Sequence, residues 1–165
     1  KLPEDIDGLY LGGGYPERYA EQLAANRTMR ESIRAAVQGG LPTIAECGGF
    51  LYLHRTLDGA EMAGVIDADA HMTGRLQPFG YVTLTAGRDN LLCRAGETIR
   101  AHEFHYAQSG DNGDAFRAQK PNGRAWDCVH ASETLYAGFP HLYFRANPGF
   151  AQNFVRACAQ GREPI

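Results

Sequence analysis

The sequence lacks long apolar runs, and none approaches the ~20 residues that a helix needs to cross a bilayer. It also lacks the hydrophobic segment of a secretory signal peptide, since it opens on Lys1-Leu2-Pro3-Glu4-Asp5. These absences argue against membrane insertion and make the cytoplasm the expected compartment.

Clustered basic charge is also missing. Lys and Arg number 16 against 19 Asp and Glu, which gives a formal net charge of -3, and the cations are scattered singly along the chain. Because phosphate groups and anionic lipids are bound by clustered cations, neither a nucleic acid nor a membrane surface is an expected partner. The sequence leaves homo-oligomerisation open.

Cysteines are few and widely spaced. The chain has four, with no C-x-x-C pair: Cys47, Cys93, Cys128 and Cys158. This spacing fits neither a zinc ribbon nor a dense disulfide framework, so we expect reduced thiols, one of which could be reactive.

The length of 165 residues and the hydrophobic content of 44% predict one globular domain over residues 1–165. A short apolar strand at 7–11 comes almost directly after the first residue. We therefore expect a fragment that lacks the first elements of its domain.

The first third of the chain alternates between strands and helices. The pattern predicts strands at 7–11 and 41–45 and helices at 17–25, from 28 to the glycines at 39–40, and from 50 to 54. This order predicts an α/β fold with an open, mostly parallel sheet flanked by helices on both faces.

The middle of the chain changes character. Strands are predicted at 82–84, 98–106, 115–118 and 128–136, separated by turn sequences rich in Gly, Asn and Asp. They predict an antiparallel portion, after which Asn147 and Pro148 begin a closing helix.

Cys47 lies between the strand at 41–45 and the next predicted helix. A nucleophile on such a tight turn projects above the sheet, and the unpaired N–H groups of a helix start favour a thiolate. The alternative for Cys47 is a small buried apolar side chain.

Two glycine turns come after neighbouring predicted strands, at Gly12-Gly13-Gly14 and at Gly48-Gly49. They are expected to face one crevice, where Gly13 or Gly14 together with Gly48 could bind an oxyanion through backbone N–H groups. A plain strand-to-helix turn remains the alternative at 12–14.

A thiolate nucleophile needs a proton shuttle, and histidine suits that task near neutral pH. Of six histidines, His141 is chosen because it ends a late strand and precedes a helix cap. His54 is expected on a helix as a packing or surface residue, whereas His71 and His130 have no supporting neighbours in the sequence.

A polar segment at 102–106 resembles but does not match the H-E-x-x-H zinc motif. On a strand, alternation separates His102 from Glu103 and His105, so no metal site is predicted. A substrate or interface role is expected for the segment, which includes Tyr106, with an ordinary polar strand as the alternative.

Four motifs, at residues 11–17, 45–53, 99–106 and 138–144, resemble the C-terminal glutamine amidotransferase domain of the cobyrinic and hydrogenobyrinic acid a,c-diamide synthases. The resemblance runs in order through nearly the whole chain. It implies a class I glutamine amidotransferase fold in which Cys47 is the nucleophile, His141 is its base, and Gly13, Gly14 and Gly48 form the oxyanion site.

The resemblance further implies that glutamine is hydrolysed and that its ammonia passes to an N-terminal synthetase domain. That domain would bind ATP and Mg²⁺ and amidate the a and c acetate groups of a corrin in cobalamin biosynthesis. No cofactor is expected here, because the chain contains no Gly-x-x-x-x-Gly-Lys-[Ser/Thr] phosphate loop.

The chain departs from related glutaminases at Tyr143, where many carry the glutamate of a catalytic triad. A Cys-His dyad, or an acid from elsewhere, would then be needed. Two other functions stay open: a cysteine hydrolase or peptidase on a related sheet, and a degenerate, non-catalytic amidotransferase-like domain.

Overall fold

The computed structural model describes residues 1–77 and 79–160. At its centre lies a four-stranded sheet in the order β1-β2-β12-β11. Its strands are β1 (Leu9–Leu11), β2 (Thr43–Glu46), β12 (Leu135–Gly138) and β11 (His130–Ala131). The first three are parallel, and β11 is antiparallel to β12. Every residue of β2 is buried, so this inner strand gives a rigid base to the turn at its carboxyl end.

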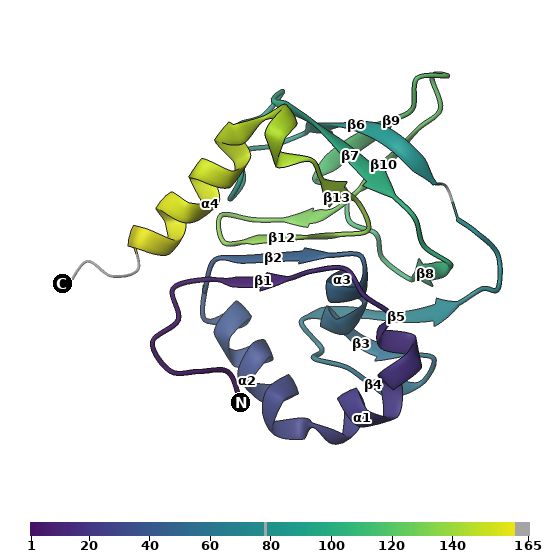
Figure 1. Ribbon diagram of the computed structural model, residues 1–165, viewed down its shortest axis with the longest axis vertical. Helices are drawn as coiled ribbons and strands as arrows, with labels where there is room; N and C mark the ends of the chain where they lie inside the picture. The colour runs from purple at the N-terminus through teal and green to yellow at the C-terminus, as the bar shows by residue number, and fades with distance from the viewer. Residues whose placement is uncertain (78, 161–165) are drawn as a thin grey trace.

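Helices cover both faces of this sheet, as predicted. The helical elements are η1 (Pro16–Tyr19), α1 (Ala20–Ala25), α2 (Arg27–Gln38), α3 (Gly48–Leu53), η2 (Phe144–Ala146) and α4 (Pro148–Gln160). Figure 1 shows α2 and α4 on opposite sides of β1, β2 and β12. Strand alternation explains the arrangement: Ile44 packs in one core cluster with Phe150 of α4, and Ala45 in another with Ile33 and Val37 of α2.

The predicted antiparallel portion forms a separate five-stranded sheet in the order β10-β9-β6-β7-β13. Its strands are β10 (Ala125–Cys128), β9 (Phe116–Gln119), β6 (Gly80–Ala86), β7 (Thr98–Glu103) and β13 (His141–Leu142). Figure 1 shows this sheet next to α4 and the central sheet. The strand β13 thus carries His141 back from the end of β12 to the edge of β7.

A third, mixed sheet has the order β4-β3-β5-β8. It consists of β4 (Ala60–Glu61), β3 (His54–Leu57), β5 (Ile66–Met72) and β8 (Ala107–Ser109). The predicted α/β class is confirmed, and the antiparallel share is larger than the sequence indicated.

Three element boundaries were predicted wrongly. The helix expected to include His54 ends at Leu53, and His54 starts β3 in an extended conformation. The strand expected at 128–136 is interrupted at Val129, whose φ of 71° divides β10 from β11. The strand expected at 98–106 ends at Glu103. In the part of the chain that the structure describes, no helix has the length and apolarity to span a membrane.

Candidate active site

Cys47 occupies the turn between β2 and α3, where its φ of 49° and ψ of -101° form a conformation that non-glycine residues rarely adopt. The turn is held by two backbone hydrogen bonds: the Cys47 N–H donates to the Gly138 carbonyl at 2.9 Å, and the Cys47 carbonyl accepts from the Leu51 N–H at 2.9 Å. The residue is 8% exposed. This backbone matches the nucleophile turn that the sequence predicted.

The two glycine turns are in contact, and neither Gly48 nor Gly49 has room for a side chain. A Cβ on Gly49 would lie 2.1 Å from the Leu11 carbonyl oxygen, and one on Gly48 would lie 2.7 Å from the Gly14 nitrogen. The Gly49 N–H donates to the Gly12 carbonyl at 3.1 Å. As the first residue of α3, Gly48 has an N–H for which its own helix offers no acceptor.

His141 lies against both turns. A Cβ on Gly13 would come within 2.5 Å of the His141 Cε1. The hydrogen bond to Cys47, and after it the interaction with Glu46, raises the pKa of His141 from 6.5 to about 10. The structure therefore brings together Cys47 and His141, which are far apart in the sequence, beside the glycines predicted for the oxyanion site.

The Glu46 carboxylate lies beside the His141 ring. The sequence alone did not suggest a function for it. It is 4% exposed, with Oε1 accepting from the Leu142 N–H at 2.8 Å and Oε2 from the Tyr10 hydroxyl at 2.6 Å. Its Oε2 is also 3.7 Å from the His141 Nδ1. One signal in the sequence could have found Glu46: it is an acid at the end of a buried strand, directly before the predicted nucleophile.

The segment at 102–106 borders Cys47 through its backbone, because the Cys47 Sγ lies 3.9 Å from the Phe104 carbonyl oxygen. Glu103 and His105 are buried, whereas Phe104 is 48% exposed, as the predicted alternation requires. The His105 ring stacks on Phe139 with centroids 3.7 Å apart. Buried packing thus accounts for His105, one of the four polar residues singled out there.

The other two, His102 and Tyr106, differ in their surroundings. His102 pairs with His141 in the register of β7 and β13 and packs edge-on against Tyr81 at 5.1 Å. Tyr106 is 42% exposed and contacts the Phe104 ring. A groove of about 920 Å³ runs beside His141 and is also lined by Tyr81, His102 and Tyr143.

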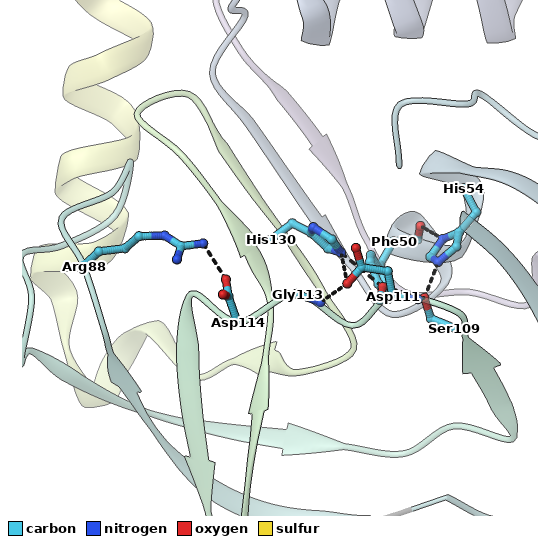
Figure 2. A network of polar contacts seen from close by, with 8 residues as sticks. All are labelled: Phe50, His54, Arg88, Ser109, Asp111, Gly113, Asp114 and His130. Carbon is cyan, nitrogen blue, oxygen red and sulfur yellow. Dashed lines mark hydrogen bonds and ion pairs between the residues drawn. The ribbon is translucent and has the colours of Figure 1, made fainter. Parts of the chain in front are cut away.

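His54 and His130 lie in a different network, shown in Figure 2. The His54 ring is fully buried, with Nδ1 2.9 Å from the Phe50 carbonyl and Nε2 2.6 Å from the Ser109 Oγ. His130 Nε2 lies 3.1 Å from the Asp111 carbonyl oxygen, so it has a partner that the sequence did not reveal. The network ties α3 and β11 to the loop after β8, and it explains His54 as a packing residue.

Comparison with known proteins places this geometry in a family. Residues 1–149 match the model of the CobB/CobQ-like glutamine amidotransferase domain. The chain is 41% identical to a cobyrinate a,c-diamide synthase of Methanothermobacter thermautotrophicus over 94% of its own length and 36% of the relative. It is 40% identical to a hydrogenobyrinate a,c-diamide synthase of Streptomyces coelicolor over 96% of its own length and 32% of the relative.

The fold is also that of a solved glutamine amidotransferase, with a TM-score of 0.60 and 17% identity over 94% of this chain and 81% of the other. Fold and sequence together define a class I glutamine amidotransferase-like domain. The chain belongs to the family of CobB/CobQ-like glutamine amidotransferase domains. It spans about a third of the length of the curated relatives that it matches.

Proposed function

We propose that this domain hydrolyses glutamine and supplies ammonia for the ATP-dependent amidation of the a and c acetate groups of cobyrinic or hydrogenobyrinic acid. The observation that carries the proposal is the contact between Cys47 and His141 beside two touching glycine turns. Because the relatives are named as a,c-diamide synthases of cobyrinate and hydrogenobyrinate, we propose a corrin as the acceptor of the ammonia.

In the proposed reaction, His141 already holds the proton of Cys47, and the Cys47 sulfur attacks the side-chain amide carbon of glutamine. The carbonyl oxygen becomes an oxyanion and receives hydrogen bonds from the N–H of Gly48 and from Gly13 or Gly14. His141 then protonates the departing nitrogen, so that ammonia leaves and a thioester remains. Water, activated by His141, releases glutamate and restores the thiol.

The ammonia acceptor belongs to a second domain in this proposal. We infer that ATP and Mg²⁺ bind there, because the present sequence contains no phosphate-binding loop. The synthetase domain would activate each corrin carboxylate, and ammonia released at Cys47 would displace the activating group.

The test is glutamate release from glutamine by the wild-type protein and by Cys47→Ala, His141→Ala and Cys158→Ala variants. The first two variants should lose activity, whereas Cys158→Ala, which removes a thiol on α4, should retain it. In a protein that includes the synthetase domain, Cys47→Ala should still amidate the corrin when ammonia replaces glutamine. Hydrolysis of peptides in place of glutamine, or no loss with Cys47→Ala, would contradict the proposal.

A further inference from the structure

The acid expected two residues after His141 is replaced by Tyr143, whose uncharged side chain is 55% exposed. We propose that Glu46 takes the place of that acid and is the positioning residue for His141. The inference rests on the proposed role of His141 in glutamine hydrolysis and names the group that orients it.

Three contacts fix the Glu46 carboxylate beside the imidazole. The Tyr10 hydroxyl and the Leu142 N–H each donate to one of its oxygens, at 2.6 and 2.8 Å. The oxygen bound by Tyr10 is the one that faces the His141 Nδ1 at 3.7 Å. Because Leu142 is the next residue after His141, the carboxylate is attached to the same short strand that carries the ring.

No second acid competes for this position. Within residues 1–77 and 79–160, Glu46 has the only carboxylate within 4.0 Å of a His141 ring nitrogen. Glu103, the other buried glutamate among these residues, has its Oε2 3.4 Å from the His105 Nε2 instead. The contact to Nδ1 leaves Nε2 as the ring nitrogen available to Cys47.

A carboxylate at Nδ1 has a definite effect on the proton transfers. It orients the ring with Nδ1 toward Glu46, so that Nε2 is the nitrogen that holds the proton taken from the Cys47 thiol. It then stabilises the imidazolium through charge, while the proton moves between sulfur, Nε2 and the departing nitrogen. In this arrangement Glu46 acts only through the histidine ring and touches no substrate atom.

The pH dependence of the site is set by the groups that face His141. These are Cys47 on the turn after β2 and Glu46 on β2, with Tyr10 of β1 bonded to Glu46. The groove beside the ring adds Tyr81, Arg100, His102 and Tyr143. Glu46 is the carboxylate among these groups. Because its negative charge favours the imidazolium, replacing Glu46 by a neutral residue should make His141 lose its proton at lower pH.

The experiment compares Glu46→Gln with Glu61→Gln, a matched change at an exposed residue of β4 that pairs with Arg30. Glutamine hydrolysis is measured across pH in both variants and in the wild-type protein. With Glu46→Gln, kcat should fall on the order of 10²-fold with little change in KM, because orientation and proton transfer are impaired while substrate contacts remain. The alkaline limb of the kcat profile should also move to lower pH, a shift that loss of folded protein alone would not cause.

Glu46→Asp keeps the charge but shortens the side chain, so its activity and alkaline limb should lie between those of Glu46→Gln and the wild type. If Glu46→Gln does not fold, Glu46→Asp decides: a lower kcat together with a shifted limb supports the inference. If the variant that folds has the kcat and the alkaline limb of the wild-type protein, the inference is overturned. An active wild-type protein and an inactive Cys47→Ala variant would still uphold the proposed function in that case, whereas an inactive wild-type protein would refute the function itself.

Discussion

The imidazole of His141 lies against the backbone of Gly13, with no room for a side chain between them. A Cβ at this position would stand 2.5 Å from Cε1 and 3.4 Å from both ring nitrogens. The first glycine turn therefore does more than expose N–H groups, because it also forms the surface on which the histidine rests.

Gly13→Ala should displace the His141 ring and reduce glutamine hydrolysis by about 10²-fold or more, since misplacement by about 1 Å can cost that much. Gly12→Ala is the matched control, because its Cβ would meet only the Tyr10 ring at 3.7 Å. Steady-state kinetics of both variants check the prediction. Equal activity of Gly13→Ala and Gly12→Ala would show that the contact between Gly13 and His141 is not needed for glutamine hydrolysis.

Gly49→Ala should destabilise the fold as well as the site. The added methyl would lie 2.1 Å from the Leu11 carbonyl oxygen and 2.7 Å from the Leu11 Cβ, so β1 and α3 would have to move apart. Overpacking of this kind costs about 1–3 kcal/mol in the free energy of unfolding. Denaturant unfolding gives the value, and a midpoint unchanged from the wild type would refute the close packing of the two turns.

Three of the four thiols, those of Cys47, Cys93 and Cys128, should differ sharply in alkylation by iodoacetamide. Burial raises the pKa of the Cys93 thiol to about 11 and that of Cys128 still further, so both should stay unlabelled until the protein unfolds. Cys47 interacts with His141 and should be modified before Cys93 and Cys128. Peptide mass spectrometry over time reports the order, and faster labelling of Cys128 than of Cys47 would be incompatible with the structure.

The His141 proton should persist far above neutral pH. Its pKa of about 10 lies above the ordinary value, chiefly through Cys47, so Cys47→Ala should bring it down. Because the folded-state pKa is the higher one, this interaction stabilises the fold below about pH 6.5 and is lost as pH rises through about 10. An NMR titration of the ring protons measures the shift, and equal values in both proteins would exclude the interaction with Cys47.

Much of the site could be predicted because its signals are local. The strand, Cys47 and the glycines after it form a single turn whose backbone demands are visible in a short stretch of sequence. His141 could be chosen from its place between a late strand and a helix cap. The central sheet could be expected from the apolar strands and from the helices that separate them.

The features that were missed depend on contacts between distant segments. The position of Glu46 before the cysteine is visible in the sequence, but its hydrogen bonds to Tyr10 of β1 and Leu142 of β13 are not. The early end of α3 places His54 at the start of β3, where its ring contacts Ser109, 55 residues away. The break at Val129 reflects its left-handed backbone, which residue type alone does not indicate, since valine seldom adopts it.

The pairing of a Cys47 nucleophile with His141 can be tested by mass spectrometry of the protein after incubation with 6-diazo-5-oxo-norleucine, a glutamine analogue that traps the nucleophile of glutaminases. We expect one covalent adduct per chain, located on Cys47, prevented by excess glutamine and formed far more slowly in His141→Ala. An unmodified protein, or an adduct on Cys93, Cys128 or Cys158 in place of Cys47, would contradict this assignment.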